Sequence, residues 1–292
     1  MTLVGWVIYN GFLPGDKFYD YANMIASAAI DRGHQTILLK NNEIISLLDQ
    51  ISINRKSFPH YVVFTDKDTY LAKQLQLLGI RVYNSAEAIE ISDDKIKTYQ
   101  VLGSKQIPIP KTIFAPKTFG FQIDEQFVES VIQYFSFPLV LKEAFGSFGE
   151  QVYLVHNRDE LFAQIEVIGT RPFMFQQFIQ TSYGKDLRLQ VVGDRVVTAM
   201  KRTSEHDFRA NVTSGGKMER YKPNEIEKQL AIQATKAIGA DFAGVDLLFG
   251  ENNAPIVCEI NSNAHIRNLL DCTGVNAAID LVHYIEKDLG DL

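Results

Sequence analysis

Cysteine is scarce in this 292-residue chain, which contains only Cys258 and Cys272. Two thiols cannot form a disulfide framework, and their spacing fits neither a C-x-x-C redox motif nor a zinc ribbon. We therefore exclude a disulfide-stabilised secreted fold and a structural zinc site of that kind. Buried thiols in a reducing compartment are the simpler interpretation, and this favours a cytoplasmic protein.

Long apolar runs and an excess of positive charge are also missing. No stretch reaches the roughly 18–20 apolar residues of a membrane-spanning helix, and residues 1–9 lack the basic region and cleavage site of a secretory signal. The 29 Lys and Arg residues against 35 Asp and Glu residues give a net charge of −6. We therefore expect no nucleic-acid partner and no membrane partner, although an acidic total can contain a local basic cluster for a small anion.

Several common enzyme signatures are absent from the sequence. There is no G-x-G-x-x-G after the first apolar run, no Walker G-x-x-x-x-G-K-[S/T], and no H-E-x-x-H, G-x-S-x-G or H-R-D motif. These absences argue against a dinucleotide fingerprint and a P-loop NTPase. Ser204, His206 and Asp207 are too close in sequence to form a nucleophilic triad, so we interpret them as loop residues.

The first ninety residues alternate between strand-like and helix-like segments. Four short apolar runs predict strands, at residues 3–9, 36–39, 61–65 and 80–83. Apolar positions at helical spacing lie between them, and Gly33 and Gly79 mark helix ends. This alternation predicts a parallel sheet with helices on its faces, so we expect residues 1–91 to form an α/β domain.

The remainder of the chain is richer in strands. A helix predicted over residues 92–102 leads into the proline-containing connector 107–111, and further helices are predicted over 125–134 and around residues 279–289. Strands are predicted at residues 138–142, 151–155, 173–179, 186–192, 195–201, 243–249 and 256–261. We expect two α+β units here, residues 92–179 and residues 180–292.

Gly193 and Asp194 form a turn signal between two predicted strands. A two-residue turn there would place Asp186 opposite Lys201, and period-2 alternation would put Asp186, Arg188, Gln190 and Lys201 on one face. A solvated polar face over a core and a cleft wall for an anion both fit this pattern.

A second hairpin is predicted around Asn252 and Asn253. Its register places Asp246 opposite Glu259, with Cα atoms roughly 4.5–5.5 Å apart, and puts Asn261 on the same face. Like charges directly opposite one another destabilise a sheet, so a neutralising partner is required. A hard cation with oxygen ligands such as Mg²⁺ is the interpretation that we favour; a shared proton or a nearby arginine is the alternative.

Lys142 ends the apolar run PLVLK and is followed by the loop Gly146-Ser147-Phe148-Gly149. Glycines let backbone N–H groups approach a phosphate closely. A solvated strand end and a plain hairpin turn are the ordinary alternatives for these two features.

The motifs identify a protein family more specifically as an ordered set than any one of them does alone. In chain order they are Asp94-Lys95, PLVLKEAFGSFG, QQFI, KDLRLQVVGDRVV, KR…DFRAN…SGG, AGVDLLF and CEIN. In this order they resemble the ATP-grasp superfamily, and the chain is similar to its RimK-like ligases, the ribosomal-protein glutamate ligase and its amino-acid-adding relatives. The resemblance covers nearly the whole chain and implies an α/β domain followed by an α+β ATP-grasp fold of two subdomains, with ATP between them.

The resemblance implies roles for the matching residues. The ATP-binding residues would be Lys95 and Lys142 at the phosphates, Ser147 in the glycine loop, Gln176, Gln177, Phe178 and Ile179 at adenine, Asp186 at the nucleoside end, and Asn211 in the DFR-x-N motif. Asp246, Glu259 and Asn261 match the magnesium ligands, as the hairpin argument also indicates. Arg209, with Arg188 and Arg202, would stabilise reacting oxygens; salt bridging is the alternative for the last two.

The activity that the resemblance implies is ATP-dependent amide formation. A carboxylate attacks the γ-phosphate to give an acylphosphate and ADP, and an amine then displaces phosphate. The cofactors would be ATP and two Mg²⁺ ions, with Mn²⁺ as a replacement. The partners would be an amino acid such as glutamate and a small-molecule, peptide or protein acceptor, and a homo-oligomer is compatible with the family. An ATP-grasp kinase and a non-catalytic nucleotide-binding module are the alternatives.

Two positions depart from the family pattern. Gln151 stands where a third loop glycine is usual, so loop closure is expected to differ. Ser262-Asn263-Ala264-His265 replaces the usual Ala-Ser-Pro-Gly, which leaves the donor and acceptor open. His265 is either a residue that orients a substrate or a structural histidine.

Overall fold

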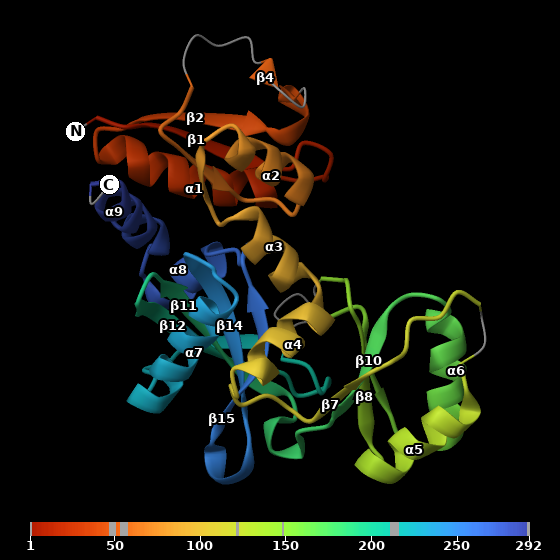
Figure 1. Cartoon of the computed structure of the whole chain (residues 1–292). Helices are drawn as coiled ribbons and strands as arrows, with labels where there is room; N and C mark the ends of the chain where they lie inside the picture. The colour runs from red at the N-terminus through yellow and green to blue at the C-terminus, as the bar shows by residue number, and fades with distance from the viewer. Residues whose placement is uncertain are drawn as a thin grey trace.

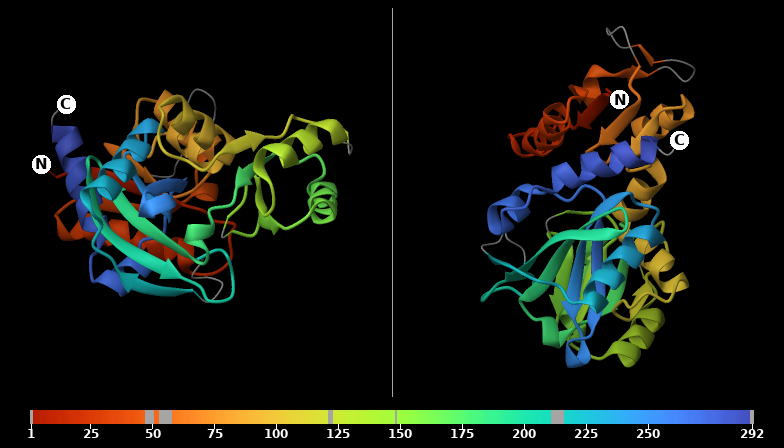
Figure 2. Two further views of the ribbon diagram at one scale, coloured as in Figure 1. Left: turned by 90° about the horizontal axis from the view of Figure 1, so that it is seen from below. Right: turned by 90° about the vertical axis from the view of Figure 1, so that its left-hand side faces the viewer.

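Three main sheets organise the chain in a computed structural model that describes residues 2–46, 51–52, 58–120, 123–147, 149–210 and 216–290 (Figure 1). We call them the N-terminal, central and C-terminal sheets. Figure 2 shows that the central sheet and its helices extend to one side, while the other two sheets and their helices lie on top of each other. The expected fold class, an α/β N-terminal part followed by a two-part α+β ATP-grasp, is confirmed by this architecture.

The N-terminal sheet is parallel, as the alternation of apolar runs predicts. Its strands are β1 (Val4–Tyr9), β2 (Gln35–Lys40), β5 (Tyr61–Phe64) and β6 (Arg81–Tyr83), in the order β2-β1-β5-β6. Alternate residues of β1 point to opposite faces, so Val7 packs toward α1 (Lys17–Asp31) and Ile8 packs toward α2 (Thr69–Leu77). A short 3-10 turn (Asn41–Glu43) and the two-stranded pair β3 (Ile45–Ser46) and β4 (Ile51–Ser52) follow β2.

Two helices connect this sheet to the rest, where the sequence predicted one over residues 92–102. They are α3 (Ala86–Asp93) and α4 (Lys95–Ser104). Asp94 separates them because its backbone is extended and its carboxylate accepts hydrogen bonds from the backbone N–H groups of Ile96 and Lys97. The predicted helix is therefore wrong at its start, and Lys95 becomes the first residue of a new helix.

The central sheet is antiparallel, in the order β7-β10-β8-β9. Its strands are β7 (Thr112–Phe114), β8 (Leu139–Glu143), β9 (Val152–Val155) and β10 (Phe173–Gln177). Helices α5 (Glu125–Phe135) and α6 (Arg158–Ile168) cover its outer face, and their apolar side chains form a separate core with Leu139, Leu141 and Phe175 (Figure 1). The inner face is thereby left for the pocket described below.

The C-terminal sheet is also antiparallel, in the order β13-β12-β11-β14-β15. Its strands are β11 (Lys185–Val192), β12 (Arg195–Thr203), β13 (Lys217–Arg220), β14 (Phe242–Phe249) and β15 (Pro255–Asn261). Leu187, Leu189 and Val245 pack on one face against α7 (Glu225–Ala237). Period-2 alternation then directs Asp186, Arg188 and Asp246 to the opposite face.

The C-terminal end of the chain returns to the N-terminal sheet. After α8 (Arg267–Thr273), helix α9 (Ala277–Gly290) packs against α1. Leu281, Val282 and Ile285 share one core with Val7 and Ile25, and the ion pair between Arg32 and Glu286 joins the two helices at the surface. No helix in the described ranges is long and apolar enough to cross a membrane.

Candidate functional site

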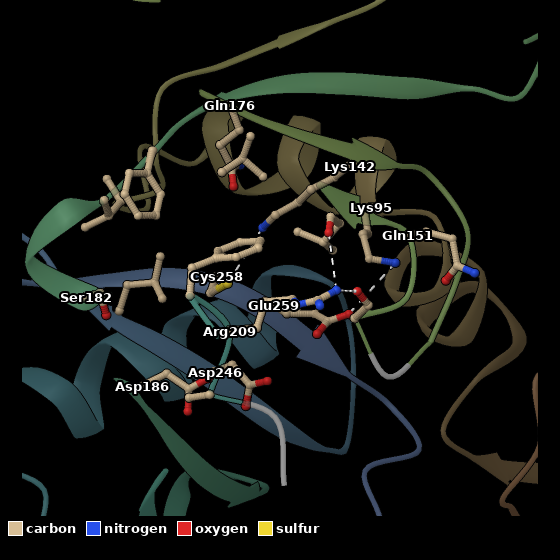
Figure 3. A pocket seen from close by; sticks show the side chains of 18 of the residues that line it. Lys95, Lys142, Gln151, Gln176, Ser182, Asp186, Arg209, Asp246, Cys258 and Glu259 are labelled. Atoms are coloured by element: carbon tan, nitrogen blue, oxygen red, sulfur yellow. Dashed lines mark hydrogen bonds and ion pairs between the residues drawn. The ribbon is translucent and has the colours of Figure 1, made fainter. Parts of the chain in front are cut away.

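A pocket lies between the inner faces of the central and C-terminal sheets, with the first residue of α4 at one end (Figure 3). Most of the predicted site residues line it. These are Lys95, Lys142, Ser147, Gln176, Gln177, Phe178, Ile179, Asp186, Arg202, Arg209, Asp246 and Glu259. Arg188 and Asn261 are not part of the lining, and Asn211 lies outside the described residues.

One end of the pocket is suited to a flat aromatic ring. Gln176 is buried at 2% exposure, and its side-chain Nε2 donates to Thr112 Oγ1. The ring of Phe178 meets Phe208 edge-on with centroids 6.2 Å apart. Val140 and Leu248 add apolar walls from the two sheets, and neither was a predicted site residue. Strand alternation places Leu248 beside the acidic pair, but it does not show that β8 and β14 face each other across the pocket.

Lys142 and Lys95 bring positive charge to the interior of the pocket. Lys142 is 7% exposed; its ammonium lies 3.7 Å from Cys258 Sγ and 5.7 Å from the centroid of the Tyr99 ring. Lys95 Nζ donates to Gly146 O at 3.0 Å and lies 3.9 Å from Glu259 Oε1. Burial lowers the pKa of Lys95, and repulsion from Lys67 and Lys142 adds to this shift while Glu259 opposes it. These are charges that an anionic ligand would relieve.

Gln151, which departs from the family pattern, packs beside the glycine loop. Gly146 has a φ of 141°, and a Cβ built on it would lie 2.1 Å from Gln151 Oε1. The Gln151 side chain therefore occupies the space beside Gly146, and its Oε1 is buried without a hydrogen-bond partner. The positive φ at position 146 favours glycine, and any larger residue there would also displace the Gln151 side chain.

Arg209 connects the two sides of the pocket. Its Nη1 donates to the backbone oxygen of Gly149 in the glycine loop and, at 3.3 Å, to that of Val152. Its Nη2 donates to Asp207 Oδ2 at 2.7 Å, and this hydrogen bond lowers the pKa of the Asp207 carboxyl. Asp207, which sequence reasoning left as a loop residue, orients the predicted catalytic arginine.

The first hairpin has a different register from the predicted one. Val192 faces Arg195 as expected, but an irregularity between Gln190 and Val191 shifts the rest of the pairing by one residue. Asp186 therefore lies opposite Arg202, and Lys201 lies opposite Leu187. Placing Lys201 on the face of Asp186 was wrong, because a single bulge moves every later side chain of that strand to the other face.

The second hairpin brings Asp246 opposite Glu259, as predicted, and Gly244 opposite Asn261. Near the turn the predicted register is wrong, because Phe249 faces Pro255 instead of Ile256. An irregularity between Asp246 and Leu247 restores the expected pairing at the acidic end.

Two arginines contact Asp246. The sequence analysis gave a nearby arginine as one alternative to a cation for neutralising the acidic pair. Arg188 donates to both of its carboxylate oxygens at 2.6 Å, and Arg202 Nη2 lies 2.9 Å from Oδ2. Arg202 also forms a two-point contact with Asp186 at 2.7 and 2.6 Å. Burial opposes ionisation of Asp246, but the two arginines outweigh it and hold its pKa below the usual range.

His265 lies between the C-terminal sheet and α1. Its ring is 5.3 Å from the Phe18 centroid and 5.2 Å from the Tyr21 centroid. Burial, with repulsion from Lys17 and Arg188, lowers the pKa of His265 to about 4, so the imidazole is neutral at pH 7. Two residues before it, Asn263 Nδ2 donates to Asp66 O at 2.7 Å and so connects this segment to the N-terminal sheet.

The sequence model of the RimK-like ATP-grasp domain matches residues 92–285. The chain belongs to the RimK-like ATP-grasp family. A protein from Trichodesmium erythraeum named probable alpha-L-glutamate ligase is 34% identical over 226 residues, which cover 76% of this chain and 73% of that protein. The resemblance inferred from the ordered motifs is confirmed, and the chain is an ATP-dependent ligase that forms C–N bonds.

Solved structures show the same fold in other ATP-grasp ligases. A RimK domain protein from Sphaerobacter thermophilus aligns with a TM-score of 0.73 at 22% identity, over 96% of this chain and 98% of that one. The D-alanine–D-alanine ligase of Bacillus anthracis, solved with ATP, aligns with a TM-score of 0.72 at 16% identity, over 99% of this chain and 98% of that one.

ATP-grasp ligases use ATP with Mg²⁺, and the side chains matched to the magnesium ligands here carry the oxygen donors that a hard cation prefers. Both oxygens of Asp246 accept hydrogen bonds from Arg188 in this structure, so a cation would share or replace these contacts. Asp246 and Glu259 pair across neighbouring strands, with the Asn261 amide two residues further along β15. The amide of Asn261 would coordinate a cation through its oxygen, while its Nδ2 atom is buried without a hydrogen-bond partner. Among the residues that the structure describes, no group of three His, Cys, Asp or Glu side chains forms an alternative metal cluster.

Proposed function

We propose that this ligase joins a carboxylate to an amine through an acylphosphate, adding an amino acid such as glutamate to a small-molecule, peptide or protein acceptor. The observation that carries the proposal is a single pocket in which the buried Lys142 and the largely buried Lys95 face two carboxylates on adjacent strands of the C-terminal sheet. The choice of glutamate rests on relatives named as probable alpha-L-glutamate ligases.

The pocket residues divide into two groups in this proposal. Gln176, Gln177, Phe178 and Ile179 hold adenine, Asp186 lies at the nucleoside end, and Lys95, Lys142, Ser147 and Asn211 bind the phosphates. Asp246, Glu259 and Asn261 hold two Mg²⁺ ions, for which Mn²⁺ is the replacement. When bound, these ions neutralise phosphate oxygens and so lower the barrier to attack.

The protein's own contribution to the reaction is positioning and charge. A carboxylate oxygen attacks the γ-phosphorus, and the bond to the bridging oxygen breaks as ADP leaves with the electron pair. The amine nitrogen then adds to the acyl carbon, loses a proton and expels phosphate. Arg209, together with Arg202 and Arg188, stabilises the oxygens that gain charge. Arg209 is suited to this because its guanidinium already reaches the glycine loop.

The chain divides in this proposal into residues 1–91, 92–179 and 180–292, with the nucleotide between the second and third units. We place the reaction in the cytoplasm, where the two free thiols stay reduced.

The test is a product analysis with ATP, Mg²⁺ and pairs of candidate carboxylates and amines. Release of ADP and phosphate that depends on the amine, together with an amide product, is the expected result. A stable phosphorylated product without amide would favour the kinase alternative. ATP binding with no turnover across a broad substrate panel would favour a nucleotide-binding module.

A further inference from the structure

A lysine of the N-terminal sheet reaches the glycine loop of the central unit. Lys67 follows β5, and its Nζ donates to Ser147 Oγ at 3.3 Å and to Asp93 Oδ1. Ser147 lines the nucleotide pocket, while Asp93 is the last residue of α3. The residue was not a sequence candidate, because no motif contains it and its contact with the loop joins positions 80 residues apart.

The backbone that carries Lys67 is held in place from two directions. The carboxylate of the preceding residue, Asp66, accepts hydrogen bonds from Asn10 Nδ2 and Asn41 Nδ2, both at 3.0 Å. The Asp66 backbone oxygen accepts a hydrogen bond from Asn263 in the segment that follows β15. Asn10 and Asn41 come directly after β1 and β2, and Asp66 comes two residues after the end of β5. Lys67 therefore leaves from the carboxyl edge of the parallel sheet, where open α/β sheets bind ligands.

The pocket runs along β8, and this gives its two ends different chemistry. Val140 pairs with Gln176 at the end proposed for adenine, Lys142 comes two residues later, and the glycine loop follows the strand. Lys95 contacts Gly146 at this far end, and Lys67 contacts the next residue, Ser147. A nucleotide lying along β8 with adenine at Gln176 therefore brings its last phosphate toward Lys95 and Lys67.

The contact with Asp93 does not hold Lys67 away from a phosphate. The two side chains are 45% and 26% exposed, and an ion pair between such partly hydrated groups contributes little to stability. A terminal phosphoryl group carries more charge than a carboxylate and accepts several charge-assisted hydrogen bonds. The flexible four-carbon stem of lysine allows its ammonium to move from one acceptor to the other.

We propose that Lys67 binds the γ-phosphoryl group of ATP, so that the N-terminal sheet supplies one of the cations for the group that is transferred. This inference rests on the proposed function, because it requires ATP in the pocket. When the carboxylate attacks and ADP leaves, Lys67 keeps its contact with the phosphoryl oxygens, now part of the acylphosphate. It gains or loses no proton in the step.

The experiment compares the affinities for ADP and for a non-hydrolysable ATP analogue with an imido bridge to its γ-phosphate, both with Mg²⁺ and measured by calorimetry. Lys67→Ala should weaken binding of the ATP analogue about tenfold or more, as loss of a charge-assisted hydrogen bond predicts, and should leave ADP affinity within about twofold. Lys67→Arg should restore most of the loss, because it keeps the positive charge.

Two control variants separate phosphate binding from the ion pair. Neither Lys67 nor Lys97 is among the residues that line the pocket, but Lys67 contacts the glycine loop whereas Lys97, which is 46% exposed, pairs with Glu90 on α3. Lys97→Ala therefore removes a lysine of matched exposure and should change neither affinity. Asp93→Asn removes the ion pair but keeps Lys67, and it should not weaken binding of the ATP analogue.

Three results would overturn the inference. An equal loss for ADP and the ATP analogue in Lys67→Ala, or no loss for either, would show that Lys67 does not recognise the γ-phosphoryl group. If Asp93→Asn reproduced the effect of Lys67→Ala, the role of Lys67 would be to form the ion pair with Asp93 and not to bind phosphate. If the unaltered protein bound neither nucleotide, the proposed function would fail together with this inference, whereas normal binding with an unaffected Lys67→Ala would overturn this inference alone.

Discussion

The two hairpins of the C-terminal sheet make an instructive comparison, because both were predicted from turn residues and each contains one irregularity. In β11–β12 the pairing is as predicted at the turn, and the bulge then moves Asp186 opposite Arg202. In β14–β15 the pairing differs at the turn, and the irregularity then brings Asp246 opposite Glu259 as predicted. Turn residues therefore locate a hairpin, while a bulge decides which side chains meet at its far end.

The largest expected effect tests the corrected register of the first hairpin. Arg202 is 4% exposed and contacts both Asp186 and Asp246, so Arg202→Ala leaves two buried carboxylates without this partner. We expect the free energy of unfolding to fall by about 3–5 kcal/mol, measured by denaturant titration. Lys201→Ala is the matched control and should cost no more than about 1 kcal/mol, because Lys201 pairs with the exposed Glu219. The reverse order of effects would favour the register predicted from the turn.

The next effect concerns the acidic end of the second hairpin. Glu259→Gln should lower Mg²⁺-dependent turnover by about 100-fold or more, because a ligand for the ion would be lost, while the fold is kept. Glu251→Gln makes the same chemical change in the turn of that hairpin and should leave turnover unaltered. Steady-state ADP release measures both variants. Unaltered turnover in Glu259→Gln would remove Glu259 from the metal site.

The third effect is a pH dependence of stability caused by His265, which follows the second hairpin. The pKa of His265 is about 4 in the folded protein, whereas a histidine of the unfolded chain has its ordinary pKa of 6.5. As the pH falls, the unfolded chain therefore takes up a proton before the folded protein does. Stability should therefore decrease by about 2 kcal/mol between pH 7 and pH 5. His265→Phe should remove that part of the pH dependence, as unfolding titrations at both pH values would show. An unchanged slope in the variant would assign the effect to other groups.

The smallest expected effect is on ATP affinity, and it tests Lys142 in the central sheet, outside the two hairpins. Lys142→Ala should weaken ATP binding about tenfold, because a buried ammonium would no longer meet a phosphate. Calorimetry with ATP and Mg²⁺ measures it, with Lys97→Ala as the control. Unchanged affinity would mean that Lys142 is an ordinary strand end.

Local patterns predicted much of the fold. The apolar runs of β1, β2, β5 and β6 carry their own signal, and period-2 alternation separates the core face of β11 from its polar face. Helix α7 was missed although Asn224 and Glu227 form a capping box at its start. Most of α3 was missed, and the helix predicted over residues 92–102 begins before α4, because the capping role of Asp94 depends on a backbone conformation that the sequence alone does not show.

The site residues that belong to sequence motifs were predicted, whereas the contacts between strands that are distant in sequence were missed. The ordered motifs named Lys95, Lys142 and the segment from Gln176 to Ile179. The pairing of Arg188 with Asp246 requires β11 to lie beside β14, although 49 residues separate the two strands. The same reason hides Lys67, whose partners lie on α3 and in the glycine loop. Such contacts depend on topology, which residue spacing does not encode.

The core shared by α1 and α9 has a consequence for how the pocket opens. It joins the first and last parts of the chain into one solid base, whereas the central sheet and its two helices have a core of their own. We therefore expect the central sheet and its two helices to move as one unit when the pocket opens. The contacts of Lys67 and Arg209 with the glycine loop join that unit to the rest of the chain.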